Sequence, residues 1–224
     1  MRDAEFFRRW MAAAAAAVER EADRLTELDS PIGDADHGSN LLRGFTAVVR
    51  EQEAERPEQP GAVLQLAGRT LISTVGGASG PLYGTLLRRA GKELGTAAEV
   101  TDEQVREALY AGVGAVAKLG GAAPGDKTML DSLVPGVSGL ATSYRAAAEA
   151  AENGALATVP MQARKGRASY LGERSIGHQD PGATSSALLL AALADVVDAA
   201  DVDVADASDV ADASDASGVT EEES

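Results

Sequence analysis

One polar stretch interrupts the apolar, alanine-rich first part of the chain: Leu28-Asp29-Ser30-Pro31-Ile32-Gly33-Asp34-Ala35-Asp36-His37-Gly38-Ser39-Asn40. Asp34 and Asp36 are two residues apart, so their side chains project to the same side of an extended or turning backbone. Asp29 lies across the turn of residues 30–33 and can supply a third carboxylate. Carboxylates that are held together repel one another unless a cation lies between them. Because these are hard oxygen ligands without a nearby cysteine, they favour Mg²⁺ or Ca²⁺ over Zn²⁺.

The residues after these aspartates are typical of a helix N-terminus, with small polar residues followed by leucines: Gly38-Ser39-Asn40-Leu41-Leu42. Helix N-termini bind phosphate, so a cation site beside this one suggests a metal–nucleotide complex. From spacing alone a solvated turn remains the alternative, because Asp, Gly, Ser and Asn are also ordinary turn residues. An EF-hand loop is excluded, since the twelfth position counted from Asp34 is Phe45 rather than Glu.

The composition of the 224-residue chain limits its function. Cysteine is absent, which excludes disulfides and thiolate chemistry, and the net charge is −15 with only four lysines. Nucleic-acid binding is disfavoured, because it requires clustered Lys and Arg. We expect a soluble, cytoplasmic protein without a membrane segment, since the N-terminus lacks signal-peptide features and the alanine run at 12–17 is too short to span a bilayer. The acidic composition, with more Arg than Lys, also resembles that of halophilic proteins, where net charge maintains solubility.

Apolar residues recur at helical spacing along most of the chain, and no stretch alternates as a strand would. Thr101 with Gln104, and Thr128 with Asp131, match capping boxes that begin helices, and we expect Asn153-Gly154 to turn the chain. The expected fold is all-α, an eight-helix antiparallel up-and-down barrel or bundle over residues 1–198. Residues 199–224 are acidic and of low complexity, so we expect a disordered tail there. The helices are expected at about residues 3–28, 38–55, 61–75, 81–92, 101–120, 129–151, 155–165 and 181–198.

The connections between these helices suggest where a ligand binds. In an up-and-down bundle, every second connection lies at the same end. The connections after the first, third, fifth and seventh helices are rich in glycine and polar residues, whereas those at 56–60, 93–100 and 152–154 are not. We therefore expect a ligand site at one end of the bundle. The connections that would form it are residues 29–38, 76–81, 120–128 and 166–180.

Four motifs lie within these connections and the helices that they begin. They are Gly33-Asp34-Ala35-Asp36-His37-Gly38, Gly76-Gly77-Ala78-Ser79-Gly80-Pro81-Leu82-Tyr83-Gly84, Gly125-Asp126-Lys127-Thr128-Met129-Leu130-Asp131, and Gly166-Arg167-Ala168-Ser169-Tyr170 with Asp180-Pro181-Gly182-Ala183. Together they resemble the nucleotide-binding L subunit of dihydroxyacetone kinases, the DhaL family, over about residues 5–198. The resemblance implies an eight-helix antiparallel barrel that holds ADP or ATP and two Mg²⁺ at one end.

In the phosphotransferase-linked form of this family, the resemblance further implies that ADP is a tightly bound, resident coenzyme. An M subunit, supplied from phosphoenolpyruvate, would rephosphorylate it in place. The γ-phosphoryl would then pass to dihydroxyacetone held by a separate K subunit, giving dihydroxyacetone phosphate. Metal clamping and alignment can carry such a transfer without a protein nucleophile.

The resemblance assigns roles to individual residues of this chain. The two Mg²⁺ would be held by Asp29, Asp34 and Asp36. The nucleotide phosphates would be contacted by His37, Gly38, Ser39, Asn40, Ala78 and Ser79. The nucleotide would be lined and capped by Gly120 or Gly121, Met129, Arg167, Asp180, Pro181 and Gly182. For His37 a role as general base is the alternative, and we prefer phosphate contact because the acceptor would be bound by another protein.

Two other functions are compatible with the sequence. One is a conventional ATP-dependent kinase with exchangeable ATP, acting on dihydroxyacetone or on another carrier-bound substrate such as a fatty acid. A single-chain kinase of this kind would need a further substrate domain, for which 224 residues leave no room. The other is a regulatory nucleotide-binding module that contacts a transcription factor.

Overall fold

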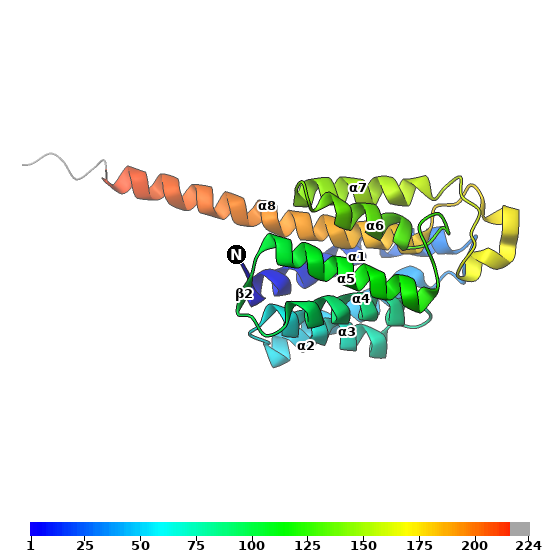
Figure 1. Ribbon diagram of the computed structural model, residues 1–224, viewed down its shortest axis with the longest axis horizontal. Helices are drawn as coiled ribbons and strands as arrows, with labels where there is room; N and C mark the ends of the chain where they lie inside the picture. Colours follow the sequence, from blue (N-terminus) through cyan, green and yellow to red (C-terminus); the bar gives the residue numbers. More distant parts are fainter. Residues whose placement is uncertain (216–224) are drawn as a thin grey trace, which may run out of the picture.

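The computed structural model describes the backbone of residues 1–215 and the side chains of residues 1–200. The regular secondary structure of this part of the chain is almost entirely helical (Figure 1), as the sequence predicted. Its elements, in chain order, are β1 (Arg2–Asp3), α1 (Ala4–Asp29), α2 (His37–Glu55), α3 (Pro60–Thr74), α4 (Ser79–Leu94), β2 (Glu99–Val100), α5 (Asp102–Gly120), α6 (Leu130–Gly139), α7 (Tyr144–Ala157), the 3-10 helix η1 (Arg167–Ser175) and α8 (Pro181–Asp215).

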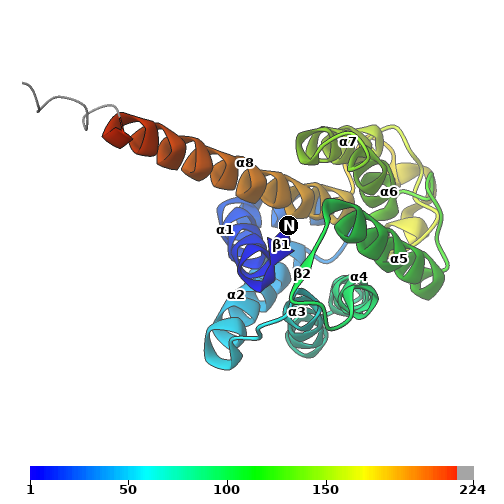
Figure 2. The same cartoon turned by 60° about the vertical axis from the view of Figure 1, so that its left-hand side comes forward.

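The helices close into a barrel. Each helix packs against the next one along the chain, and α8 returns to pack against α1. Figure 2 shows the resulting ring, whose apolar faces share one core, so the predicted eight-helix barrel is confirmed. The buried face of α1 repeats at helical spacing, with Phe7, Trp10 and Ala14 among its members. Trp10 Nε1 donates a hydrogen bond of 2.9 Å to the carbonyl of Leu189 in α8, which joins the first and last helices.

The boundaries predicted between residues 129 and 165 are wrong. The chain breaks at residues 140–143, where Ser143 caps α7 by accepting a hydrogen bond of 3.0 Å from the N–H of Ala146. Asn153 and Gly154 lie inside α7 and do not form a turn. A β-carbon at Gly154 would lie 2.1 Å from the carbonyl oxygen of Asp131 in α6, so this glycine permits close helix packing. Within residues 1–215 the number of α-helices remains eight, because the break at 140–143 replaces the expected one at 152–154.

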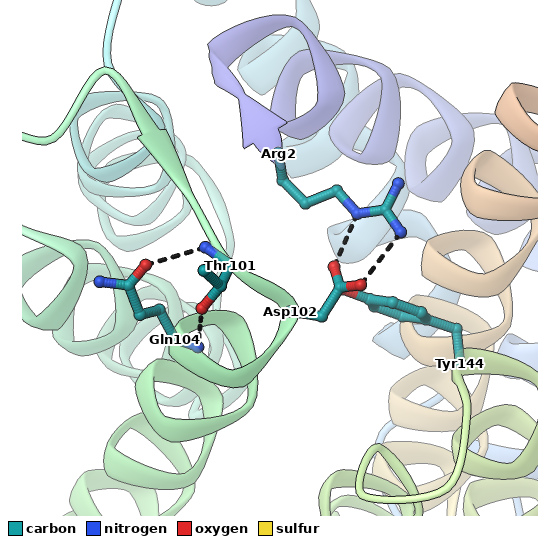
Figure 3. A network of polar contacts seen from close by, with 5 residues as sticks. All are labelled: Arg2, Thr101, Asp102, Gln104 and Tyr144. Carbon is teal, nitrogen blue, oxygen red and sulfur yellow. Dashed lines mark hydrogen bonds and ion pairs between the residues drawn. The ribbon is translucent and has the colours of Figure 1, made fainter.

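A polar cluster joins three elements at the end of the barrel formed by the connections after α2, α4 and α6, which we call the distal end. Arg2 Nε donates a hydrogen bond of 2.7 Å to Asp102 Oδ1, and the hydroxyl of Tyr144 donates to the same oxygen at 2.7 Å (Figure 3). Arg2 also lies over the rings of Phe6 and Tyr144, at 5.0 and 5.4 Å from the ring centroids. The cluster therefore links β1 to the first turns of α5 and α7.

The structure around this cluster tests two expectations about local structure. The capping box at the start of α5 is confirmed, since the Thr101 side chain accepts from the N–H of Gln104 and the Gln104 side chain accepts from the N–H of Thr101 (Figure 3). The expectation of no strand is wrong only for β1 and β2, a two-residue antiparallel pair in which Arg2 faces Val100.

The last helix is longer than expected. We predicted an end near residue 198, and α8 continues to Asp215. Most of the expected acidic tail, residues 199–224, lies outside the part whose side chains are described. Within the described residues, the stretch Pro181–Ala200 is long and apolar enough to cross a membrane by length and composition, but 67% of its most apolar window is buried inside the barrel. Its apolar character is therefore that of a core helix.

Candidate functional site

The four polar connections meet at one end of the barrel, opposite the distal end, and enclose a cavity of about 400 Å³. One part of its lining is polar and comes from the start of α2, the start of α4 and the connection between α7 and α8. Another part is apolar and comes from α4, α5 and α6, including Leu82, Val116 and Leu119. The predicted site residues that line the cavity are Asp29, Asp34, Asp36, His37, Ala78, Ser79, Gly120, Met129, Arg167, Asp180, Pro181 and Gly182.

Three of the predicted residues do not line this cavity: Gly38, Ser39 and Asn40. Gly38 is buried against α1, where a β-carbon would lie 1.9 Å from the carbonyl oxygen of Ala22. The Asn40 side chain is also buried and accepts a hydrogen bond from Arg43. Ser39 Oγ turns back to donate to the carbonyl of Asp36 at 3.0 Å. In this structure these residues shape the first turn of α2, where the N–H of Asn40 also donates to the carbonyl of Asp36 at 2.9 Å.

The structure brings the three predicted metal ligands together. One ligand oxygen of each of Asp29, Asp34 and Asp36 lies within 4.8 Å of the others. Asp29 Oδ2 accepts hydrogen bonds from the N–H groups of Asp36 and His37, at 3.0 and 3.3 Å, which orients this carboxylate. Ala35 between the other two has a left-handed backbone with φ of 58°, a conformation that non-glycine residues adopt mainly where the surrounding structure imposes it. The result is an all-oxygen cluster that fits Mg²⁺.

A guanidinium group lies beside the carboxylate cluster. Arg167 Nη2 is 2.9 Å from Asp34 Oδ2, and both side chains are solvent-accessible. Arg167 lies in η1, a 3-10 helix within residues 166–180, which were expected to connect the last two helices. The arrangement places a positive charge at the mouth of the cavity, where it offsets part of the negative charge of the three aspartates.

His37 belongs to a buried hydrogen-bond network that joins α2, α4 and α8. Its Nε2 lies 2.8 Å from Ser185 Oγ, and its Nδ1 lies 3.2 Å from Ser79 Oγ. The Tyr83 hydroxyl lies 2.6 Å from Ser185 Oγ and 2.9 Å from Ser186 Oγ. Burial lowers the pKa of His37, although the charges of Asp29 and Asp36 oppose this shift. The imidazole is therefore neutral near pH 7, and it takes part in the network as one donor and one acceptor.

The other members of this network, Tyr83, Ser185 and Ser186, were not predicted from the sequence. Tyr83 is fully buried, and burial raises its pKa to about 12 against the opposing hydrogen bonds of the two serines, so it stays protonated. The available signal was two adjacent serines directly before the apolar run Ala187–Ala194 of α8. Buried hydroxyls need partners, and here those partners lie about a hundred residues away in the sequence.

Asp180 caps α8. Its Oδ2 accepts a hydrogen bond of 2.7 Å from the N–H of Ala183, and Pro181 is the first helical residue. Burial raises the pKa of Asp180 to about 7, and the charges of Asp131 and Asp29 act in the same direction. The Ala183 N–H and the charge of Lys127 oppose this shift. Asp180 is thus a carboxyl group that can hold a proton near neutral pH.

Sequence comparisons identify relatives of this chain. The sequence profile of the DAK2 domain matches residues 31–195. The chain is 46% identical over 195 residues to the ADP-binding subunit DhaL of the PEP-dependent dihydroxyacetone kinase of Escherichia coli (strain K12), a match that covers 83% of this chain and 93% of the relative. It is 41% identical over 188 residues to the ADP-binding subunit DhaL of the PTS-dependent dihydroxyacetone kinase of Lactococcus lactis subsp. lactis (strain IL1403), covering 84% of this chain and 95% of the relative.

A comparison of structures gives the same result. The fold is similar to part of the dihydroxyacetone kinase from C. freundii in complex with AMP-PNP and Mg²⁺, with a TM-score of 0.66 and 28% sequence identity. The match covers 83% of this chain but only 33% of the kinase chain, so this chain spans about a third of that longer protein. From the profile match and the two relatives matched over nearly their whole length, we conclude that the chain belongs to the DAK2-domain family, among the DhaL subunits of dihydroxyacetone kinases.

Proposed function

We propose that this chain is the nucleotide-binding, phosphoryl-transfer subunit of a dihydroxyacetone kinase. The observation that carries the proposal is the cluster of three carboxylates, within 4.8 Å of one another, beside the N-terminus of α2 and at the edge of the cavity. The family supports this function, because the relatives in E. coli and L. lactis are named ADP-binding subunits. The similar kinase structure from C. freundii was solved with AMP-PNP and Mg²⁺.

Different residues of the cavity would contact the metal ions, the phosphates and the base. Asp29, Asp34 and Asp36 would hold two Mg²⁺, which when bound supply positive charge to the phosphates. The first turn of α2, from His37 to Asn40, would contact the phosphates, with Ala78 and Ser79 beside it. The N–H groups of Gly38 and Ser39 would be the donors there, because those of His37 and Asn40 are bonded to Asp29 and to the Asp36 carbonyl. The apolar side of the cavity, with Gly120 and Met129, would line the base. Arg167 and the start of α8, residues 180–182, would close the site.

His37 serves best as a fixed hydrogen-bonding group. The ring is held on both nitrogens, by Ser185 and Ser79, so it is oriented before any ligand arrives. A neutral imidazole neither repels Mg²⁺ nor adds charge to the site. Ser79, which lines the cavity next to His37, can exchange its bond with the ring for one to a phosphate oxygen.

The finer parts of the proposal concern partners and donor. We infer that ADP stays bound as a coenzyme, that an M subunit of the phosphotransferase system rephosphorylates it from phosphoenolpyruvate, and that the K subunit presents dihydroxyacetone. The names of the relatives, which are PEP-dependent or PTS-dependent kinases, support this assembly. The main alternative is a kinase domain that binds ATP loosely and exchanges it.

One measurement separates the coenzyme from the exchangeable nucleotide. The purified protein is desalted, then denatured, and the released nucleotide is quantified by ion-exchange chromatography. We expect roughly stoichiometric ADP, since two dications and three carboxylates hold the diphosphate from several sides. Protein that emerges empty, yet binds and exchanges ATP quickly, would overturn the coenzyme proposal in favour of the conventional kinase.

The donor is tested by reconstitution. The chain is mixed with purified K and M subunits and dihydroxyacetone, and dihydroxyacetone phosphate is measured with either phosphoenolpyruvate or ATP as donor. The phosphotransferase-linked assignment predicts product from phosphoenolpyruvate that depends on all three proteins. Product formed from ATP without the M subunit, at the same rate, would contradict it.

A further inference from the structure

Lys127 is a buried lysine whose ammonium group is bonded entirely to backbone. Its exposed fraction is 1%, although it lies in the connection between α5 and α6. The Nζ atom donates hydrogen bonds to the carbonyls of Met161 at 3.0 Å and Ser175 at 2.7 Å, and to that of His178. An ammonium group has three donors, so all of them are used. A buried charge is costly unless it is hydrogen-bonded, and here three carbonyl dipoles supply those bonds.

All three acceptors belong to one segment, residues 158–180, which runs between α7 and α8 and which we call the capping segment. The acceptors are spread along it, since Met161 precedes η1, Ser175 is its last residue and His178 follows it. A second bond links the same two regions, because the N–H of Arg164 donates to the carbonyl of Asp126 at 3.0 Å. Residues 126 and 127 thus hold the capping segment at several points.

The backbone of Lys127 is consistent with a constrained position. Its φ of 60° lies in the left-handed region, which costs energy for any residue except glycine. A buried side chain and a left-handed backbone are both unusual for a lysine. The connection between α5 and α6 does not by itself require either feature. Both are explained by the contact that Lys127 makes with the capping segment.

The capping segment carries groups that line the cavity. Lys165, Gly166, Arg167 and Ala168 all line it, and Arg167 pairs with Asp34 of the carboxylate cluster. The segment ends at Asp180, which caps α8. Lys127 itself lines the cavity, as do Thr128 and Met129 that follow it. Lys127 therefore joins two walls of the cavity through its side chain.

We propose that Lys127 is a positioning residue that fixes the capping segment over the cavity and thereby sets how slowly a bound nucleotide leaves. The part that concerns nucleotide release rests on the proposed function. The part that concerns the capping segment does not, because it follows from contacts within the chain. The two parts are tested separately.

The first test uses trypsin on nucleotide-free protein. The capping segment offers four cleavage sites, at Arg164, Lys165, Arg167 and Arg174. Lys127→Met keeps the length of the side chain but removes its charge and donors, and we expect cleavage within the segment to become at least ~10-fold faster while helical content by circular dichroism is retained. Lys92→Met, at an exposed lysine near the distal end, serves as the matched control and should be cleaved as the wild type is. Cleavage of Lys127→Met at the wild-type rate would overturn the proposal.

Chemical restoration distinguishes the ammonium group from mere packing. Because the chain has no cysteine, Lys127→Cys carries a single thiol that can be alkylated in denaturant before refolding. Aminoethylation rebuilds a side chain with an ammonium group at the length of lysine, and propylation builds a neutral one of the same length. We expect the aminoethylated protein to resist trypsin within threefold of wild type refolded in parallel, and the propylated one to be cleaved as Lys127→Met is. Equal cleavage of the two alkylated proteins would contradict a role for the charge.

If Lys127→Met does not fold, Lys127→Gln, which keeps two N–H donors, takes its place.

The second test measures release of a fluorescent ADP analogue in the presence of Mg²⁺, by stopped-flow displacement with excess ADP. We expect release at least ~10-fold faster from Lys127→Met and from the propylated protein, with recovery on aminoethylation. If the wild type binds the analogue but Lys127→Met releases it at the same rate, the inference fails. If the wild type does not bind Mg-ADP at all, the proposed function fails, and the trypsin comparison alone decides the role of Lys127.

Discussion

Gly33 shows how a single position controls the carboxylate cluster. A β-carbon there would lie 1.9 Å from Asp29 Oδ1 and 3.1 Å from the Asp29 carbonyl oxygen. Its N–H also donates to that carbonyl at 2.6 Å, which closes the turn after α1. Any larger residue would push the Asp29 carboxylate away from Asp34 and Asp36. The spacing of the three aspartates in the sequence is therefore useful only because the turn between them is tight.

Substitutions in the cluster should weaken metal and nucleotide together. For Asp34→Asn and Asp36→Asn we expect Mg²⁺-dependent ADP retention to fall by at least ~10-fold, the lower end of what losing even an outer partner of a metal site costs. Helicity should be nearly unchanged, because Asp34 is exposed and the half-buried Asp36 makes no capping hydrogen bond to α2 through its side chain. Nucleotide content after desalting and circular dichroism measure the two effects.

The control for these variants is Asp23→Asn, an exposed aspartate on α1 outside the cavity. It removes the same charge and should retain wild-type nucleotide content. Unchanged nucleotide content in Asp34→Asn and Asp36→Asn would remove both residues from the site.

The pKa of Asp180 predicts how stability depends on pH. This pKa is raised from its ordinary value of 3.8 to about 7, so between these values the folded protein holds a proton that the unfolded chain has lost. The stabilising effect of that proton is complete below the ordinary value, and it is lost as the pH rises through about 7. In this window the slope reaches about 1.4 kcal/mol per pH unit for one group. The wild type should therefore lose stability, relative to Asp180→Asn, as the pH rises.

Urea unfolding of the nucleotide-free, metal-free proteins at about pH 5.5 and about pH 8 measures this difference. The amide of Asp180→Asn can still accept the hydrogen bond from Ala183, so the helix cap is kept and only the titration is removed. A stability difference between the two proteins that is the same at both pH values would show that Asp180 does not titrate in this range.

Individual site residues could be predicted from the sequence where the signal was local. Each of these signals consists of a few neighbouring residues: the aspartates, the glycine-rich turns and the Asp-Pro pair at Asp180. The structure places them around one cavity. The roles of three other residues could not be predicted in the same way: Tyr83, Ser185 and Lys127. Their hydrogen-bond partners lie far away in the sequence. Lys127, for example, is bonded to carbonyls 34, 48 and 51 residues away, and carbonyls have no sequence signature.

Among the helices, α6 and α7 are the two whose boundaries were predicted wrongly from the sequence. Asn153-Gly154 has the composition of a turn, and the true break at residues 140–143 lacks a strong signal apart from Ser143. The reason is that glycine has two uses, to permit unusual backbone angles and to permit close approach. Gly154 serves the second, since it packs against the backbone of Asp131. Helices with an uninterrupted apolar face, such as α1 and α2, were predicted to within about one or two residues.

Two glycine-to-alanine changes in helices should therefore have opposite effects. Alanine is favoured over glycine in a helix by about 1 kcal/mol, but overpacking typically costs about 1–3 kcal/mol. A β-carbon at Gly154 would lie 2.1 Å from a backbone oxygen, so we expect Gly154→Ala to be destabilising overall. At Gly114 in α5 nothing lies within 4 Å of the new carbon, so Gly114→Ala should be neutral or stabilising.

Urea unfolding of the two variants beside the wild type measures both changes. Because the residue change is the same, the propensity term is shared and the difference between the variants isolates the packing of α7 on α6. A Gly154→Ala protein as stable as Gly114→Ala would mean that the two helices can move apart at little cost.

At the scale of the whole molecule, charge is the feature that the fold does not explain. The net charge of −15 exceeds what solubility of a small domain requires, and such self-repulsion destabilises a compact state unless salt screens it. We expect the melting temperature to rise between about 0.1 M and about 2 M KCl, over which the screening length falls from ~10 Å to a few ångströms. A melting temperature that does not move with KCl would contradict the interpretation that the composition is halophilic.

The bond between Trp10 and Leu189 has a consequence for how the barrel is made. It joins residues 179 positions apart, across the contact between α1 and α8 that closes the ring. During synthesis the apolar side of α1 that packs against α8 therefore stays uncovered until Leu189 has left the ribosome. Since contacts this distant in sequence are slow to form, the seam is expected to close late. The protein has a single tryptophan, and it lies at this seam. Its fluorescence should therefore report when α8 packs against α1 in the final step of folding.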